Sequence, residues 1–251
     1  MLVSVHHKIN LGLHVIEKLP SGYHAIETIF YPCHNYKDTL EIIPTAQFSF
    51  NIKDADFTCD MVNNLCVKAY RLLQRDFDLP PVKITLTKKI PSGSGLGGGS
   101  ADAAFTLKML NSVFSLQLSL KQLHKYATLL GSDTTFFLYD TPMYATGRGE
   151  ILEPVDLDLS KYRIEIVCPK ISISTARAYG EVTPKKPNVC LKQIISYPVE
   201  TWKNHLINDF EENIFKKHPL LKEIKNEFYS RGAVYAAMSG SGSAVYGIFN
   251  V

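Results

Sequence analysis

The residues most suggestive of chemistry lie between positions 88 and 104. Five glycines at 93, 95, 97, 98 and 99 follow Pro91 and directly precede Ser100 and Asp102. Glycine loses more conformational entropy on folding than any other residue, so a dense cluster must be justified by backbone geometry. Close approach to an anion, with N–H groups and the positive end of a helix dipole facing it, is one such reason. The sequence therefore predicts a loop that cradles phosphate groups.

Three known phosphate-binding loops fit these residues poorly. The glycines at 93, 95 and 98 satisfy the G-x-G-x-x-G spacing of dinucleotide folds, but no acidic residue stands between Asp102 and Asp133 to bind a ribose. No lysine directly follows the glycines, as a Walker A loop requires. The protein-kinase signatures are absent. A purely structural glycine turn is the remaining alternative, although five glycines directly before a helix argue against it.

The surrounding elements must position this loop. An alternating apolar pattern over 82–90 predicts a strand that leads into it, and the residues after it predict a helix. Other patterns predict strands at 2–5, 8–16, 25–31, 39–44, 47–52, 162–167, 233–238 and 244–249. They also predict a helix from an Asp60 cap to about 76, a helix with a Ser119–Gln122 capping box that ends at Gly131, an apolar strand after Asp133, helical segments within 199–214 and a helix from Pro219 to before Gly232.

Composition excludes several classes of protein. The 251 residues are 45% hydrophobic and 20% charged, which indicates a globular chain with one large or two modest domains. The net charge of +3 permits anionic small-molecule substrates without demanding nucleic acid. Five scattered cysteines without a C-x-x-C pair argue against a zinc site and for a reducing, cytoplasmic location. No apolar run approaches the roughly 18 residues that a membrane span needs.

Several motifs together resemble one superfamily. The segment 91–101, Pro-Ser-Gly-Ser-Gly-Leu-Gly-Gly-Gly-Ser-Ala, resembles the second motif of the galactokinase, homoserine kinase, mevalonate kinase and phosphomevalonate kinase (GHMP) superfamily, and 238–243 resembles its third. The segment 8–15, followed by Gly22-Tyr-His24, resembles the first motif of the 4-diphosphocytidyl-2-C-methyl-D-erythritol kinases. The segments 64–69 and 131–137 fit the same family, in the same order.

This resemblance implies a fold and a reaction. The fold would be α+β and two-lobed, with an N-terminal lobe (1–150) like domain 2 of ribosomal protein S5, a C-terminal α/β lobe (151–251) and the active site between them. The reaction would be ATP- and Mg²⁺-dependent phosphorylation of the 2-hydroxyl of 4-diphosphocytidyl-2-C-methyl-D-erythritol, in the non-mevalonate isoprenoid pathway. The protein would be cytoplasmic, a monomer or weak dimer, and would bind neither nucleic acid nor membrane.

The resemblance also implies which residues bind ATP. Asn64 and Lys68 would lie near the adenine, and Ser100, with Asp102 as a second candidate, would lie near Mg²⁺. The triphosphate would be bound by Pro91, Ser92, Gly93, Ser94, Gly95, Leu96, Gly97, Gly98, Gly99, Ser100 and Ala101.

The acceptor side follows from the same resemblance. Asp133 would take the proton from the acceptor hydroxyl, and Lys8 would hold Asp133 ionised; read alone, Asp133 is a turn or cap residue and Lys8 a solvated lysine. Asn10, two residues from Lys8 and hence on the same strand face, would bind the acceptor. The remaining acceptor-binding residues would be Tyr23 and His24 for the cytosine, Tyr179 near the cytidine, and Gly240 with Gly242 closing the site.

The sequence departs from the family pattern at three places. His6-His7 replace small residues before Lys8, Ala101 replaces a serine, and Ser132, Thr134 and Thr135 replace the usual neighbours of Asp133. The chain is also short, which predicts trimmed loops in the C-terminal lobe. Two alternatives stay open: another small-molecule kinase of the superfamily, and a non-catalytic nucleotide- or RNA-binding protein.

Overall fold

A computed structural model describes residues 1–54 and 61–251 of the chain. They form two compact units that are interleaved along the sequence. Unit 1 comprises residues 1–7, 33–92 and 97–140, and unit 2 comprises residues 8–32, 93–96 and 141–251. Because the two units are interleaved, they do not test the predicted division into residues 1–150 and 151–251. The lobe boundary near residue 150 therefore stays a prediction.

The described residues are rich in both strands and helices. The strands are β1 (Leu2–Lys18), β2 (His24–Pro44), β3 (Ser49–Lys53), β4 (Val82–Thr87), β5 (Met143–Thr146), β6 (Ile151–Pro154), β7 (Tyr162–Val167), β8 (Tyr235–Met238) and β9 (Val245–Asn250). The α-helices are α1 (Leu65–Phe77), α2 (Gly98–Val113), α3 (Leu120–Leu130), α4 (Thr175–Glu181), α5 (Leu191–Ile194), α6 (Glu211–Lys217) and α7 (Pro219–Ser230). The 3₁₀ helices are η1 (Met61–Asn63), η2 (Ser132–Leu138) and η3 (Val199–Asn204).

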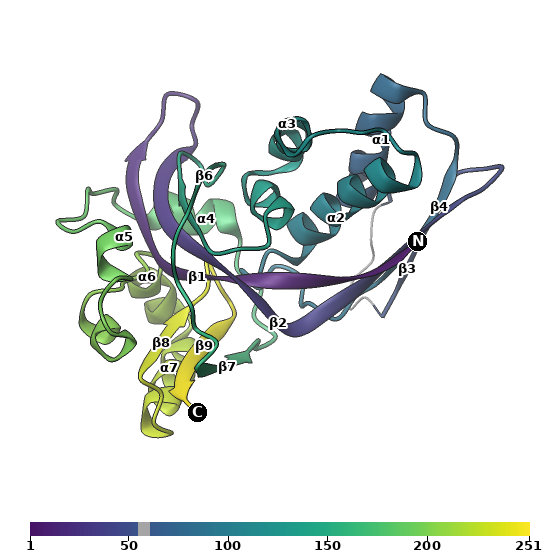
Figure 1. The fold of residues 1–251 in the computed structure, drawn as a ribbon. Coiled ribbons are helices and arrows are strands. Elements are labelled where there is room, and N and C mark those ends of the chain that lie inside the picture. Colours follow the sequence, from purple (N-terminus) through teal and green to yellow (C-terminus); the bar gives the residue numbers. More distant parts are fainter. Residues whose placement is uncertain (55–60) are drawn as a thin grey trace. The chain divides into compact units, whose positions relative to one another are not determined.

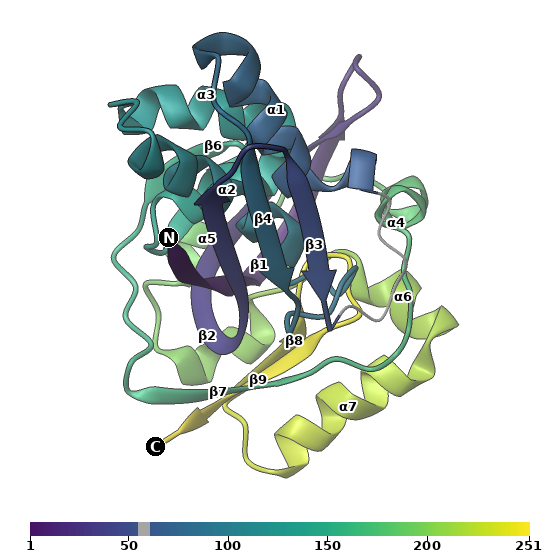
Figure 2. The ribbon, with the colours of Figure 1, turned by 90° about the vertical axis from the view of Figure 1, so that its right-hand side faces the viewer.

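In unit 1, helices cover a short sheet. β4 pairs antiparallel with β2 over 39–44 and parallel with β3, and Figure 2 shows the three strands side by side. Parallel neighbours need a crossover, which α1 supplies between β3 and β4. Helices α1, α2 and α3 lie together in Figure 1. Ala101, Ala103 and Ala104 of α2 are fully buried, and such small side chains let neighbouring elements approach closely.

In unit 2, β9 lies between β7 and β8 in an antiparallel sheet, and α7 runs along it (Figure 2). Phe228 of α7 packs where a side chain at Gly247 of β9 would stand, because a Cβ there would lie 2.8 Å from the ring. The apolar core beneath includes Leu221, Phe228 and Val245. In the same unit, β2 pairs with β5 over Thr28–Phe30, and β5 pairs with β6.

Several local predictions are confirmed. The Ser119 side chain accepts a hydrogen bond from the backbone N–H of Gln122, and the Gln122 side chain accepts one from the N–H of Ser119, so α3 has its capping box. That helix ends at Gly131, and α7 begins at Pro219 and ends before Gly232. The strands predicted at 2–5 and 8–16 are both parts of one long strand, β1, and those predicted at 25–31 and 39–44 are both parts of β2.

One local prediction is wrong, and another is confirmed with an interruption. The apolar run after Asp133 is not a strand but the 3₁₀ helix η2, since Thr135 Oγ1 donates to the Ser132 carbonyl and closes a tight turn. The helical segments predicted within 199–214 are η3 and the start of α6. Between them, the stretch 207–209 pairs with Leu13 of β1 through two backbone hydrogen bonds of 2.9 Å.

Other elements begin at unexpected places or went unpredicted. Helix α1 begins at Leu65, capped by Asn64, whose side chain accepts from the N–H of Cys66 at 2.9 Å; the predicted cap, Asp60, lies outside the described residues. The short elements α4, α5, β5 and β6 were not predicted. No helix within 1–54 or 61–251 has the length and apolar character needed to cross a membrane.

His6, one of the departures from the family pattern, is a buried histidine of unit 1. Its ring packs against those of His34 (5.0 Å), Phe105 (5.5 Å) and Phe137 (5.6 Å). Burial lowers the pKa of His6 below 6.5 and outweighs Asp140, a carboxylate 2.7 Å away whose side chain is 54% exposed. The folded protein therefore resists protonating His6, whereas the unfolded chain does not.

This histidine predicts a pH dependence of stability. As the pH falls through 6.5 towards the folded-state pKa of His6, the unfolded chain binds the extra proton first, so the free energy of unfolding should decrease. In His6→Gln, the loss of stability between about pH 7.5 and about pH 5.5 should be smaller, as measured by urea unfolding at both pH values. His205→Gln, at an exposed position, is the control. An unchanged pH slope in His6→Gln would contradict the assignment.

Candidate active site

Lys8 lies at the centre of the polar contacts in unit 2. Its side chain is almost fully buried, with 2% exposed. The ammonium donates to Asn10 Oδ1 at 2.5 Å and to the Gly95 carbonyl at 2.8 Å, and lies 5.1 Å from the centroid of the Phe30 ring. A buried ammonium is tolerated only with such partners. The interpretation of Lys8 as a solvated lysine is therefore wrong, and the prediction that Asn10 shares its face is confirmed.

Ser239 contacts the same two acceptors as Lys8. Its hydroxyl lies 3.0 Å from the Gly95 carbonyl and 3.4 Å from Asn10 Oδ1, and it accepts from the Asn10 N–H at 3.2 Å. Residues from β1, the glycine loop and the loop after β8 thus meet at one point of unit 2. Ser239 was not predicted as a site residue, because the sequence of the loop does not distinguish its hydroxyl from those of Ser241 and Ser243.

The glycine loop is fixed to unit 2 by its carbonyls. The Ser94 carbonyl accepts from Ala244 N–H at 2.9 Å, the Gly95 carbonyl accepts from Lys8, and the Leu96 carbonyl accepts from Lys8 N–H at 3.0 Å. In a trans peptide the N–H points opposite to the carbonyl. The N–H groups that follow these carbonyls therefore point away from these contacts, as in a loop that offers its amides to an anion.

Different structural causes favour glycine at different positions of the loop. A Cβ at Gly95 (φ +80°) would lie 2.0 Å from the Ser239 carbonyl oxygen, so backbone occupies that space. At Gly98 a Cβ would lie 2.8 Å from Ile90 Cγ2, so close packing at the start of α2 requires glycine there. At Gly93 (φ +65°) the space is open, so only its backbone conformation favours glycine. Approach to a ligand is thus not the only cause of the cluster.

A buried charge cluster in unit 1 holds the two ends of the loop. The Lys88 ammonium contacts Asp38 and donates to Asp102 Oδ2 of α2 at 2.7 Å. Asp38 Oδ1 accepts from the N–H groups of Lys89 and Ile90, the residues directly before Pro91. Burial raises the pKa of Asp102 to about 7, although the neighbouring Lys88 ammonium acts to lower it. This ion pair joins the strand that enters the loop to the first turns of the helix that leaves it.

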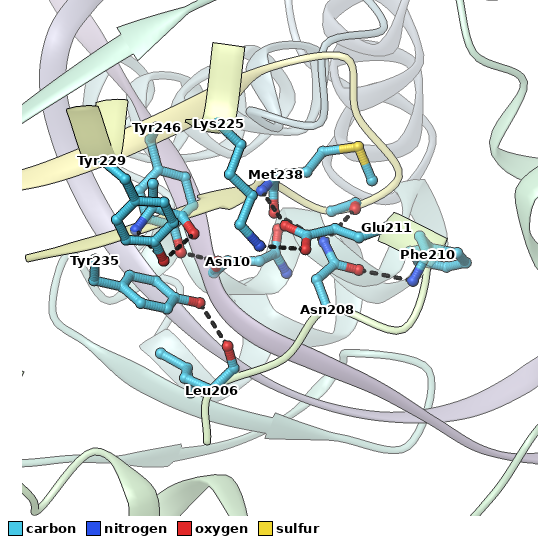
Figure 3. Close-up of polar contacts among 12 residues, drawn as sticks. Asn10, Leu206, Asn208, Phe210, Glu211, Lys225, Tyr229, Tyr235, Met238 and Tyr246 are labelled. Atoms are coloured by element: carbon cyan, nitrogen blue, oxygen red, sulfur yellow. Dashed lines mark hydrogen bonds and ion pairs between the residues drawn. The ribbon is translucent and has the colours of Figure 1, made fainter. Parts of the chain in front are cut away.

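The loop after β8 is supported from below by Asn208 (Figure 3). Its Nδ2 donates at 2.8 Å to the carbonyls of both Met238 and Gly240, and its Oδ1 accepts from the Phe210 N–H at 3.0 Å. Glu211 accepts from the Met238 N–H at 2.8 Å. The other Glu211 oxygen, Oε2, accepts from Lys225 Nζ at 2.6 Å. Asn208 and Glu211 together therefore hold the backbone on both sides of Ser239.

Two residues predicted to bind the acceptor lie against each other in unit 2. The rings of His24 and Tyr179 stack with centroids 5.2 Å apart and planes 18° apart. Tyr23 is 58% exposed, and the Arg148 guanidinium lies 5.0 Å from its ring centroid. Burial lowers the pKa of His24, which keeps its imidazole neutral at pH 7. A neutral imidazole offers one donor and one acceptor, as recognition of a base edge requires.

The other predicted residues lie in unit 1. Asp133 lies in the first turn of η2, for which Gly131 is the N-cap. A Cβ at Gly131 would lie 4.0 Å from Ser100 Oγ, so η2 begins beside the first turn of α2. Lys68 lines a cavity of about 600 Å³ together with Val62 and Val67. Because Lys8 belongs to unit 2, its pairing with Asp133 stays a prediction.

Comparisons with known proteins agree with these motifs. Residues 64–141 match the model of the GHMP kinases N terminal domain, and residues 201–250 match that of the GHMP kinases C terminal domain. The 4-diphosphocytidyl-2-C-methyl-D-erythritol kinase of Bacteroides fragilis is 49% identical over 247 residues, which cover 97% of this chain and 90% of that enzyme. The chain belongs to the 4-diphosphocytidyl-2-C-methyl-D-erythritol kinase family. The enzyme of the same name from Azobacteroides pseudotrichonymphae is 50% identical over 96% of this chain and 91% of its own length.

Solved structures confirm the predicted fold class. A crystal structure of a 4-(cytidine 5'-diphospho)-2C-methyl-D-erythritol kinase matches with a TM-score of 0.82 at 30% identity, covering 99% of this chain and 90% of that one. The Methanococcus jannaschii mevalonate kinase matches with a TM-score of 0.70 at 17% identity, covering 100% and 90%, which shows the shared fold alone. As a member of this GHMP kinase family, the chain is an ATP-using kinase.

The glycine loop of this kinase gives a paired prediction. Gly95→Ala would place a Cβ 2.0 Å from the Ser239 carbonyl, whereas Gly93→Ala, at a similar positive φ, meets nothing within 4 Å. Both variants carry the cost of a left-handed alanine, about 1–2 kcal/mol. Only Gly95→Ala should also displace the loop, and it should raise the KM for ATP well above that of Gly93→Ala. Equal KM values for ATP in the two variants would count against the contact between the loops.

Proposed function

We propose that this kinase transfers the γ-phosphate of ATP to the 2-hydroxyl of 4-diphosphocytidyl-2-C-methyl-D-erythritol, giving the 2-phosphate and ADP for the non-mevalonate isoprenoid pathway. The observation that carries the proposal is the buried Lys8 ammonium, held by Asn10 and Gly95 in the same unit as the stacked rings of His24 and Tyr179. Relatives about half identical over nearly their whole length have the same activity in their names, which supports it.

The aromatic residues Tyr23, His24 and Tyr179 of unit 2 support recognition of the cytidyl end. Bases bind to protein aromatic rings by stacking, which tolerates small shifts of the ligand. Tyr23, exposed and with Arg148 at its ring, and Tyr179 are the rings on which a cytosine would stack. The neutral His24 imidazole would hydrogen-bond the base edge. Gly240, near Asn10, and Gly242 would line the path from the cytosine to the reacting hydroxyl.

The donor site rests on the glycine loop and α2. The residues from Pro91 to Ala101 would bind the triphosphate through amide N–H groups, with the helix dipole of α2 behind them. The cavity of about 600 Å³ beside Lys68 is apolar enough for an adenine, and Asn64 caps the helix that forms its wall.

The residues present fit Mg²⁺ that arrives with the nucleotide. No cluster of three His, Cys, Asp or Glu ligands exists among residues 1–54 and 61–251. Mg²⁺ in kinases is commonly bound by phosphates, water and one or two protein groups, so such a cluster is not required. Ser100, in the first turn of α2, is the candidate protein ligand, whereas the Asp102 carboxylate is buried and held by Lys88. When bound, Mg²⁺ neutralises charge on the β- and γ-phosphates.

The transfer itself requires a base and positive charge. In the proposed step the Asp133 carboxylate accepts the hydroxyl proton, the acceptor oxygen bonds to the γ-phosphorus, and the bond to the β–γ bridging oxygen breaks as ADP leaves. The Lys8 ammonium would orient Asp133 and stabilise charge on the transferring group.

Monomeric or weakly dimeric assembly, a cytoplasmic location and the absence of nucleic-acid binding remain predictions.

An acceptor panel tests this function. With ATP and Mg²⁺, the protein should release ADP with 4-diphosphocytidyl-2-C-methyl-D-erythritol and far more slowly with mevalonate or homoserine. Lys8→Ala and Asp133→Ala should each lower kcat by about 10²-fold or more, since each removes a group that acts in the transition state. ATP binding, measured by calorimetry, should persist in both variants.

Lys203→Ala, at an exposed position of unit 2, is the matched control for Lys8→Ala and should leave the rate unchanged. No turnover of the cytidyl acceptor, or equal turnover of all three acceptors, would refute the proposed substrate. Near wild-type kcat in Lys8→Ala or Asp133→Ala would refute the role of that residue only.

The stacked pair predicts a separate effect on acceptor affinity. Tyr179→Ala should raise the KM for the cytidyl acceptor by roughly 10-fold, since base–aromatic stacking contributes about 1–3 kcal/mol. Tyr179→Phe keeps the ring and should restore affinity. Tyr197, whose ring contacts His205 elsewhere in unit 2, offers a matched Tyr→Ala control. A Tyr179→Ala enzyme with an unchanged acceptor KM would exclude this ring from the cytosine site.

A further inference from the structure

A fully buried threonine of β2 contacts the residue that holds Lys8. Thr28 Oγ1 donates to the Gly12 carbonyl at 2.6 Å, and Asn10 Nδ2 donates to Thr28 Oγ1 at 2.9 Å. Gly12, Asn10 and Lys8 all belong to β1, whereas Thr28 belongs to β2, and all four lie in unit 2. Neither the sequence motifs nor the resemblance gives Thr28 a role.

The chemistry of these groups fixes the direction of the hydrogen bonds. A carbonyl oxygen can only accept, so the single hydroxyl proton of Thr28 is committed to Gly12. The Thr28 oxygen must then accept from its other neighbour, which has to be the NH₂ end of the Asn10 amide. The two ends of an asparagine amide have nearly the same shape, so packing alone does not choose between them.

The hydrogen-bond direction at Thr28 affects which end of the Asn10 amide faces the Lys8 ammonium. With its NH₂ end at Thr28, Asn10 presents Oδ1 to Lys8 Nζ. The reversed amide would turn an N–H donor towards a buried ammonium and remove one of its acceptors. Ser239 does not enforce this choice, because its hydroxyl can donate to Oδ1 or to the Gly95 carbonyl. The commitment of the Thr28 proton to Gly12 fixes the NH₂ end of the amide, and the ammonium, which can only donate, favours the same orientation.

We propose that Thr28 is a positioning residue for Lys8: it fixes the Asn10 amide so that its oxygen faces the ammonium. The inference rests on the proposed role of Lys8 in phosphoryl transfer. Thr28 touches neither reacting group in this scheme and acts through Asn10. The effect should therefore be on kcat rather than on the binding of ATP.

Thr28→Val and Thr28→Ser separate the hydroxyl from the shape of the side chain. Valine keeps the branched shape and removes the hydroxyl, so kcat should fall by about 10-fold or more, within the range of couplings seen in shared hydrogen-bond networks. Serine keeps the hydroxyl, and kcat should return to within about 3-fold of wild type on the same scale. The dissociation constant for ATP, measured by calorimetry, should change little in either variant.

The matched control is Thr106→Val. Thr106 is also fully buried, and its hydroxyl donates to a backbone carbonyl, that of Asp102, at 2.8 Å. This variant should leave kcat unchanged. If Thr28→Val does not yield folded protein, Thr28→Cys replaces it, because a thiol is similar in size and only a weak donor.

Three outcomes distinguish the possibilities. If kcat is at the wild-type level in Thr28→Val but strongly reduced in Lys8→Ala, this inference is overturned and the proposed function is not affected. A Thr28→Val enzyme that loses ATP binding and kcat together, without recovery in Thr28→Ser, would show a structural role and also overturn it. A wild-type kcat in Lys8→Ala would instead remove the catalytic role on which the inference depends.

Discussion

The burial of the Lys8 ammonium is the constraint on which unit 2 depends. A charged group with 2% exposure must be solvated by the protein, and its acceptors include Asn10 two residues away and Gly95 far along the chain. Those acceptors are held in turn by Thr28 and Ser239. The first strand, the glycine loop and the loop after β8 must therefore all be in place before this lysine can be buried.

This constraint explains the form of the glycine loop. The carbonyls of Ser94, Gly95 and Leu96 satisfy donors of unit 2, and the planarity of the peptide then directs the adjoining N–H groups away from them. One set of contacts thereby anchors the loop and prepares it for an anion. The glycine at 95 is required by this anchoring, because the Ser239 carbonyl occupies the space of a side chain.

The sequence predicted those features whose causes are local. The spacing of Lys8 and Asn10, the α3 capping box and the loop before α2 follow from strand alternation, capping chemistry and glycine content. Other features depend on distant partners. The segment 207–209 is extended because it pairs with Leu13, and the apolar run after Asp133 coils tightly although its composition suits a strand. The roles of Thr28 and Ser239 likewise depend on neighbours that no local pattern identifies.

Two buried lysines of this chain contact different kinds of acceptor. Lys88 contacts the carboxylates of Asp38 and Asp102, so its charge is balanced within unit 1 and its contribution is to hold the ends of the glycine loop. Asn10 and Gly95 offer Lys8 two neutral acceptors, an amide oxygen and a backbone carbonyl. Only the oxygen end of an asparagine amide can accept a hydrogen bond, so a reversed amide would take this acceptor away from the ammonium. The orientation of one amide therefore matters more at Lys8 than it would at Lys88, where either carboxylate oxygen can accept.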